Sequence, residues 1–414
     1  MNKVFTKGAA VLATGSMLFL STAGVVQAAS AGNRFSGANR FQTSIAIARQ
    51  DFQNQKVQNV VIASAYSFPD ALAASTLATK LSAPIILVGK GQHDSNVSLA
   101  FIKNHLTKGG TVTIIGGIGI IDAHVQDWLV NAGYIVTRMG GKDRFATDAM
   151  IVNDLNVPSG TPVIVASGYD FPDALGVASL AASKGWPILL SGPNQLPASA
   201  QAFIAKDLPS NVYLVGGEGV LHTTVSTTIQ TADPNAAITR FGGADRFDTL
   251  ALILKQFYPN PAQIYLANGL DFADALSGST LAAQNNAPIL LVNPKAKHLP
   301  LAIHEYLFAL RLQGSKPQVS VLGGTAGVPD WILQRVNDIL TGTVTSPTTT
   351  PGTITPPVTP PVTPPVTPPV TPPVTTPATI TPPPVTPPTP PVTTPGSVTT
   401  TPSSVTTTNS SITN

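Results

Sequence analysis

The chain has 414 residues, enough for two to four domains of ordinary size. It contains no cysteine, which excludes disulfides, thiol catalysis and cysteine-ligated metal sites. Its 23 basic and 20 acidic residues nearly balance, which argues against the broad basic surface of a general nucleic-acid-binding protein.

The first 28 residues have the pattern of a secretory signal peptide. Lys3 and Lys7 precede an apolar stretch from Gly8 to Val26, and small residues near Ala28 suit cleavage. The stretch is short and rich in glycine and alanine, which favours a cleaved signal over a membrane anchor. We therefore expect a secreted protein that has no contact with a membrane after cleavage of residues 1–28.

Four short motifs occur three times, in the same order, between residues 33 and 340. The opening motifs are "NRFSGANRFQTS" (33–44), "TRMGGKDRFATD" (137–148) and "TRFGGADRFDTL" (239–250). An acidic turn follows at 68–72, 171–175 and 272–276, then a proline-led apolar run at 84–87, 187–190 and 288–291, then a glycine turn at 116–117, 216–217 and 323–324. These landmarks predict three copies of one domain, at 33–136, 137–238 and 239–340.

Within each copy, apolar runs alternate with helical patterns. In the first copy we expect strands at 59–65, 84–89, 111–117 and 134–138, and helices at 68–81, 98–106 and 124–133. Continuous Val, Ile and Leu runs suit parallel strands that are covered on both faces. The alternation predicts an α/β fold of three-layer modules with mostly parallel sheets. Because no linker separates the copies, we expect them to pack rigidly.

The composition changes abruptly near Thr341. Residues 341–414 consist mainly of Thr, Pro, Val and Ser, with "PPVT" repeated and no charged residue. Such a segment cannot form a core, and its proline content favours an extended polyproline II conformation. We predict a disordered Pro/Thr-rich spacer.

The acidic turn has two compatible interpretations. Its repeated acids are Asp70, Asp173 and Asp274, and each follows a polar residue by three positions (Ser67, Asp170 and Asp271). This is the pattern of a helix N-cap with an acid in the first turn, which contributes about 1 kcal/mol without any function. The same turn also follows a predicted strand, where open α/β sheets place their ligands.

An arginine pair also occurs three times. The first members are Arg34, Arg138 and Arg240, and the second members are Arg40, Arg144 and Arg246. Phenylalanine follows each second arginine, and we expect it in the core. One hypothesis is that each second arginine pairs with the aspartate of its own acidic turn. The other is that the guanidinium groups face a crevice and bind a carboxylate, phosphate or sulfate group of a ligand.

The sequence offers little support for catalysis. The six histidines occupy different positions in the three copies, and neither HExxH nor GxSxG is present. The glycine turns lack the Lys-Ser/Thr of a phosphate-binding loop. We expect no catalytic residues, no metal and no cofactor, because repeated charges, caps and turns suit multivalent binding better than turnover.

The three copies resemble the cell wall binding repeat 2 modules of Gram-positive surface proteins. The resemblance rests on the G-x-[DN]-R-F-x-T opening, the F-[PA]-D-A-L turn, the P-I-[IL]-L run and the closing glycine pair. It implies a Toprim-like fold for each copy and a pseudo-threefold arrangement of the three. It also implies non-covalent attachment to an anionic polymer of the cell wall, either a secondary polysaccharide or a teichoic-acid-like chain.

The predicted polymer-binding residues combine this resemblance with the repeated charges. They are Arg34, Arg40, Arg138, Arg144, Arg240, Arg246, Asp70, Asp173 and Asp274. Two positions depart from the pattern: Asn39 replaces the aspartate of the other copies, and Ala273 replaces their proline.

The function that we expect is that of a secreted, wall-bound surface protein that is not an enzyme. Three linked weak sites on one chain would raise its avidity for a polymer by about 10²–10⁴. The alternatives are a cell-wall hydrolase or its modifier, such as an amidase-associated protein, and a structural S-layer or coat component.

Overall fold

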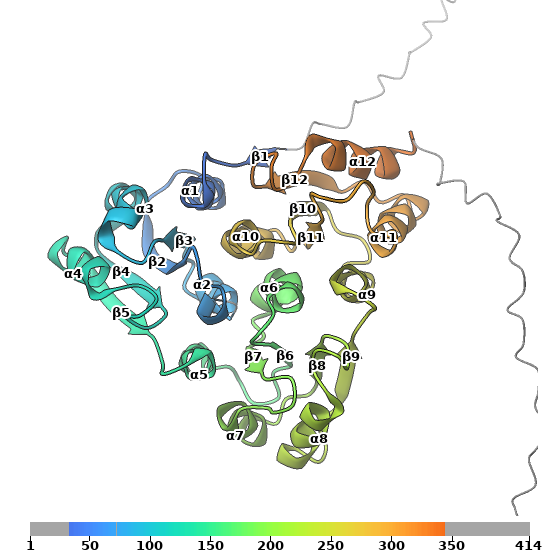
Figure 1. Cartoon of the computed structure of the whole chain (residues 1–414), viewed down its shortest axis with the longest axis horizontal. Coiled ribbons are helices and arrows are strands. Elements are labelled where there is room, and N and C mark those ends of the chain that lie inside the picture. Colours follow the sequence, from blue (N-terminus) through green and yellow to red (C-terminus); the bar gives the residue numbers. More distant parts are fainter. Residues whose placement is uncertain (1–32, 72, 344–414) are drawn as a thin grey trace, which may run out of the picture. The chain divides into compact units, whose positions relative to one another are not determined.

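A computed structural model describes residues 33–71 and 73–343 of the chain (Figure 1). The predicted signal peptide and, from residue 344, the predicted spacer lie outside the described residues. Within the described ranges, no helix is long and apolar enough to cross a membrane.

The described residues form three modules, and each contains one four-stranded parallel sheet. The strand orders are β3-β2-β4-β5, β7-β6-β8-β9 and β1-β12-β10-β11. The prediction of an α/β fold in three modules with parallel sheets is therefore confirmed.

The first module follows the predicted order of elements closely. Its strands are β2 (Val57–Ser64), β3 (Ile85–Val88), β4 (Leu106–Ile115) and β5 (Ile135–Met139). Its helices are α1 (Arg40–Asp51), a short 3-10 helix (Pro69–Ala71), α2 (Ala74–Lys80), α3 (Gln92–His105) and α4 (Ala123–Asn131). The sequence did not predict α1, and the single helix expected at 68–81 is divided in two.

The other two modules repeat this order. The second has β6 (Val163–Ser167), β7 (Ile188–Ser191), β8 (Val212–Val215) and β9 (Ile238–Phe241), with α5 (Arg144–Leu155), α6 (Pro172–Lys184), α7 (Ala198–Asp207) and α8 (Thr223–Ala232). The third has β1 (Arg34–Phe35), β10 (Gln263–Asn268), β11 (Ile289–Val292) and β12 (Gln318–Leu322), with α9 (Arg246–Phe257), α10 (Ala273–Gln284), α11 (Leu301–Leu312) and α12 (Asp330–Thr341).

Each sheet is buried on both faces, as the continuous apolar runs predict. In β2, Val61 and Ala63 belong to the central core of the protein, while Val60 and Ile62 belong to a separate core of the first module. Alternate residues of a strand point to opposite faces, so helices cover both sides of the sheet.

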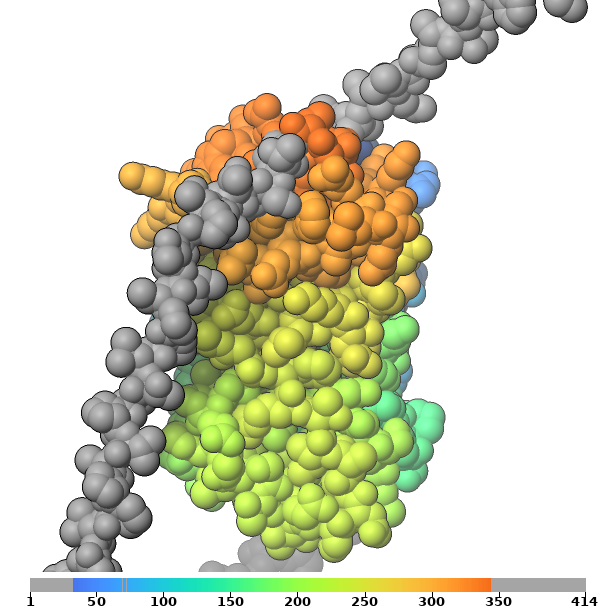
Figure 2. Space-filling view, turned by 90° about the vertical axis from the view of Figure 1, so that its right-hand side faces the viewer, coloured from blue at the N-terminus to red at the C-terminus, as the bar shows by residue number. Residues whose placement is uncertain are grey.

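Three helices, one from each module, pack together in the middle of the molecule. These are α2, α6 and α10, and each contacts the other two (Figure 1). They are rich in Ala, Ser and Gly, so their backbones can approach closely; the hydroxyl group of Ser75 donates a hydrogen bond to the carbonyl oxygen of Ala178 (3.3 Å). Figure 2 shows one side of the molecule, where yellow residues near position 250 lie between the yellow-green part of the second module and the orange part of the third.

The N-terminal strand completes the sheet of the third module. In β1, Arg34 pairs with Val321 of β12, almost 290 residues later. The sequence repeats and the folded modules are likewise out of step at the other two boundaries. The boundaries at 136/137 and 238/239 fall inside β5 and β9, and these strands pair with strands of the preceding module. Arg138 and Arg240 therefore belong to sheets of the preceding modules, and the chain closes on itself at β1.

Candidate functional site

The opening motif forms a tight loop that begins α1, α5 and α9. In the first copy, the side chain of Asn39 caps the helix by accepting from the backbone N–H of Gln42 (3.0 Å). The hydroxyl group of Thr43 accepts from the N–H of Gly37 (3.1 Å), and a Cβ at Gly37 would overlap Gln42. The equivalent bonds recur in both other copies, which explains why Gly, Asp or Asn, and Thr keep their spacing in the motif.

This loop places the second arginine of each pair at the end of a strand of its own copy. Arg40 donates to the carbonyl oxygen of Ala65 (2.6 Å), Arg144 to that of Gly168 (2.6 Å) and Arg246 to that of Gly269 (3.2 Å). Each of these arginines is half-buried. A guanidinium group has five N–H donors, so these bonds leave donors for other partners.

The acid next to each of these arginines comes from the preceding copy. Arg144 lies near Asp70, Arg246 near Asp173 and Arg40 near Asp274, where each partly opposes the rise in the pKa of the acid that burial causes, and the third pair closes the ring. Arg40 also donates to Asp271 of the third module (3.0 Å). Pairing within one copy is therefore wrong: each arginine lies near an acid of the preceding module, and Arg40 is bonded to one.

Burial dominates the charge state of the acidic turns. Desolvation, together with a neighbouring aspartate, raises the pKa of Asp173 and that of Asp274 to about 6, although an arginine opposes the shift in each case. Burial also raises the pKa of Asp70, against the hydroxyl group of Thr147 and the guanidinium group of Arg144. Asp173 and Asp274 therefore gain protons just below neutral pH.

The first arginine of each pair donates hydrogen bonds to the backbone of a glycine turn. Arg34 donates to the carbonyl oxygen of Gly323 (2.9 Å), Arg138 to that of Gly116 (2.8 Å) and Arg240 to that of Gly216 (2.8 Å). All three glycines have positive φ angles, between 105° and 124°, which L side chains rarely adopt. The contacts of Arg34, Arg138 and Arg240 are thus with backbone carbonyl groups and neighbouring side chains, and they stabilise the turns.

The predicted capping role of the residues before the acids is wrong for two helices. The N-caps of α6 and α10 are Phe171 and Phe272, and neither has a side-chain cap. Asp271 instead accepts from the backbone N–H of Ala273 (3.1 Å), since the helix begins too late for a cap at that position. The acids Asp173 and Asp274 do lie in the first helical turn, as predicted.

The sequence reasoning missed the aromatic residues of the same turns. Phe68, Phe171 and Phe272, one from each copy, contact one another with ring centroids 5.3–6.2 Å apart. Such pairs contribute about 0.5–1.5 kcal/mol beyond the area that they bury. Their identical position in three copies was the signal that could have revealed this junction.

A pocket of about 300 Å³ lies where the third module meets the first. It is lined by Gly37, Ala38, Asn39, Arg40, Thr43, Asn268, Asp271, Ala273, Asp274, Gly324, Ala326 and Gly327. The helices α1 and α10 both begin at this pocket, and helix N-termini favour anions. Both departures from the repeat pattern, Asn39 and Ala273, line this one pocket.

No group of three or more potential metal ligands occurs among the described residues. The candidate site therefore consists of arginine side chains, helix N-termini and partly protonated acids. Such a set can bind anions and hydrogen-bonding groups of a ligand.

The family model for cell wall binding domain 2 (CWB2) matches residues 34–126, 138–226 and 240–333, more than half of the chain. The chain belongs to the CWB2 family. The three matched segments begin at Arg34, Arg138 and Arg240, the first arginines of the repeated pairs, and the family resemblance seen in the motifs is confirmed.

Solved structures of similar fold include two from Clostridium difficile. Cwp8 and Cwp6 each superpose with a TM-score of 0.67 and 25% sequence identity. Cwp8 matches 75% of this chain and 51% of its own, and Cwp6 matches 74% and 47%. The match thus covers about half of each of those chains.

Similar proteins of known name include two from Bacillus subtilis (strain 168). N-acetylmuramoyl-L-alanine amidase LytC is 26% identical over 279 residues, which are 67% of this chain and 53% of the amidase. The amidase enhancer is 30% identical over 260 residues, 63% of this chain and 34% of the enhancer. The chain therefore spans about half or less of the length of these relatives.

Proposed function

We propose that this protein is a secreted surface protein that binds an anionic cell-wall polymer through its three CWB2 modules. The partner would be a secondary polysaccharide or a teichoic-acid-like chain, and the protein would reside in the cell wall without being an enzyme. Membership of the CWB2 family supports the wall location.

The proposal rests on the junction between the third and the first module. Arg40 and the N-termini of α1 and α10 converge on one pocket, so a guanidinium group and the positive ends of two helix dipoles face the same space. The acids of the turn oppose this attraction only when ionised, and the pKa of Asp274 is near 6. A phosphate or carboxylate group of a polymer suits this combination.

The repeated junctions make a polymer a better partner than a small molecule. Arg40, Arg144 and Arg246 occupy equivalent positions at the three junctions, held by one covalent scaffold. A chain with regularly spaced negative charges can contact several junctions, and each added contact raises avidity without a new binding site.

The test compares retention of the mature protein on isolated cell walls before and after acid extraction of their anionic polymers. We expect strong retention on native walls, a large loss after extraction, and weaker retention at high salt, because salt screens exposed charges. Equal retention on native and extracted walls would contradict the proposal.

A second candidate is a partner of a wall hydrolase. It is favoured by the similarity to an amidase and to an amidase enhancer. The experiment is to measure peptidoglycan clearing by a purified amidase with and without this protein. Faster clearing in the presence of the protein would support this role, and an unchanged rate of clearing would exclude it. An S-layer role would instead require ordered arrays, visible by electron microscopy.

A further inference from the structure

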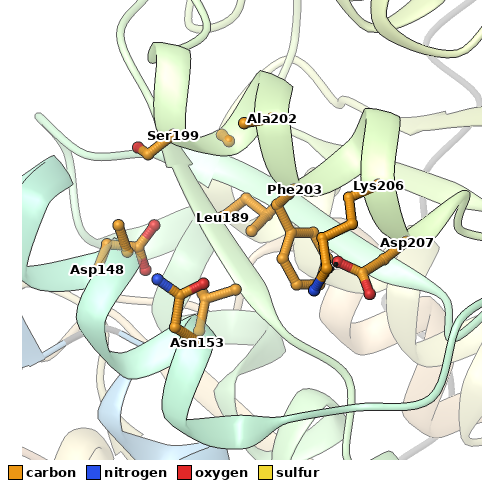
Figure 3. A pocket seen from close by; sticks show the side chains of 11 residues that line it. Asp148, Asn153, Leu189, Ser199, Ala202, Phe203, Lys206 and Asp207 are labelled. Carbon is orange, nitrogen blue, oxygen red and sulfur yellow. Dashed lines mark ion pairs between the residues drawn. The ribbon is translucent and has the colours of Figure 1, made fainter.

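A second pocket lies within the second module, away from the module junctions. It occupies the space between α5 and α7, above β7, and has a volume of about 220 Å³ (Figure 3). Asp148 and Asn153 on α5 and Ser199, Phe203 and Asp207 on α7 line it. This volume is below the roughly 300–1,000 Å³ of pockets for drug-sized ligands, so any occupant is small.

The other modules fill the equivalent space with larger side chains. Ile45, a larger side chain that is 6% exposed, stands in the first copy where Ala149 lines the pocket of the second. In the third copy, Ile303 occupies the position of Ala200 and is fully buried. The small residues of the second copy are therefore what makes room for the pocket.

A buried carboxyl group also distinguishes the second copy. Asp148 is only 4% exposed, and one of its oxygens accepts a hydrogen bond from the backbone N–H of Leu190 (2.8 Å). In the first copy the hydroxyl group of Ser44 accepts the equivalent hydrogen bond from the backbone N–H of Leu87 (3.2 Å). A hydroxyl group is therefore enough to pair this N–H, and a carboxyl group is not required. The third copy has the apolar Leu250 at this position.

The second oxygen of Asp148 has no hydrogen-bond partner among the described residues. Figure 3 shows its carboxyl group directed into the space between α5 and α7. A buried polar atom without a partner destabilises the folded protein, and a ligand that forms a hydrogen bond with it removes this cost. Burial raises the pKa of Asp148 to about 8, so the group is mostly protonated at neutral pH and does not attract a cation strongly.

We propose that this pocket binds a single neutral sugar ring, whose hydroxyl groups hydrogen-bond to Asp148 and Asn153 while its apolar face packs on Phe203. Asp207 at the opposite end is a further acceptor, since one of its oxygens lacks a hydrogen bond among the described residues, although Lys206 lies 3.7 Å from it. The proposal does not depend on binding of an anionic polymer at the junctions.

The test is a titration of the ¹⁵N-labelled protein with the methyl glycosides of glucose, N-acetylglucosamine and N-acetylgalactosamine, followed by NMR. We expect saturable shifts at the amide signals of Leu190 and Phe203. Asp148→Ser keeps an acceptor for Leu190 but removes the second oxygen, and Ala149→Ile fills the pocket as in the first copy. Each should weaken binding about tenfold or more, which corresponds to about 1.4 kcal/mol.

Asp154→Ser, at an exposed position of the same helix, is the matched control and should bind like the wild type. Amide signals of Asp148→Ser that are unchanged outside the pocket would exclude misfolding as the cause of lost binding. The proposal is overturned if no glycoside shifts these signals, if Asp148→Ser binds as well as the wild type, or if methylammonium binds in place of the sugars. Wall retention of the same variants reports separately on the module junctions.

Discussion

Arg40 of the first module donates a hydrogen bond to Asp271 of the third, 231 positions later in the chain, at 3.0 Å. The same guanidinium group donates to the carbonyl oxygen of Ala65 at the end of β2. One side chain therefore joins the two modules at opposite ends of the folded region. This contact and the pairing of β1 with β12 close the ring of modules, which explains how three short domains behave as one body.

The closing strand should contribute measurably to stability. Arg34→Ala removes hydrogen bonds to the carbonyl oxygens of Gly323 and Val328 and to Asp330. We expect the free energy of unfolding to fall by about 1–3 kcal/mol, because the carbonyl groups lose half-buried partners. Chemical denaturation measures this change. Lys297→Ala, at an exposed site, is the control, and an equal effect of both variants would contradict the role of Arg34.

The planar fork of the second arginine should matter more than its charge. Arg144→Lys keeps the charge but cannot reproduce the bond to Gly168 and the placement near Asp70 together. We expect it to reduce wall binding several-fold, while Lys142→Arg, two residues away and exposed, leaves binding unchanged. Co-sedimentation with cell walls compares the two variants. Indistinguishable retention would show that geometry at this site is unimportant.

Wall binding should strengthen on mild acidification. The pKa values of Asp173 and Asp274 are about 6, so both acids lose their negative charge between neutral pH and about pH 5. Phosphate groups of the polymer remain ionised in this range, so repulsion falls while attraction to arginine persists. Binding isotherms at the two pH values test this. Asp274→Asn should reduce the difference, and weaker binding in acid would contradict the account.

Stability should fall as the pH rises from about 5 to about 8. Burial raises the pKa of Asp51 to about 7 and that of Asp148 to about 8, from 3.8 in the unfolded chain. The folded protein therefore holds more protons in this range, and the stabilisation is lost as the pH passes the folded pKa values. Thermal unfolding measured across the range should show a decreasing midpoint. Asp51→Asn combined with Asp148→Asn should make the unfolding midpoint depend less on pH. An unchanged slope would mean that other groups cause the pH dependence.

The central helices should not tolerate larger side chains. Ala178 of α6 is 1% exposed and lies against Ser75 of α2. We expect Ala178→Leu to destabilise the protein by about 1–3 kcal/mol through overpacking. Ala205→Leu, at an exposed position of α7, is the matched control. A stable Ala178→Leu variant with intact wall binding would show that close packing of α2, α6 and α10 is dispensable.

The sequence predicted those parts of the fold that local patterns determine. The apolar runs at 59–65 and 84–89 became β2 and β3, because a strand buried on both faces needs apolar residues throughout. It could not predict that β1, two residues long, pairs with β12, since so short a strand carries no pattern.

The candidate site also has features that the sequence revealed and features that only the folded structure shows. The repeated motifs revealed the arginines and the acids, but the pairing between copies depends on how the modules pack, and no spacing within one copy encodes this. The sequence analysis did not single out Asp148, although it replaces Ser44 and Leu250 of the other copies, because its pocket depends on small residues of two helices that meet only in the folded protein.

The most direct measurement is calorimetric titration of the mature protein with the anionic polymer that acid releases from the same cell walls. The account predicts saturable binding of the soluble polymer that weakens as salt is added and that is reduced in Arg144→Lys. Absence of binding by a folded protein that is still retained on walls stripped of this polymer would contradict it.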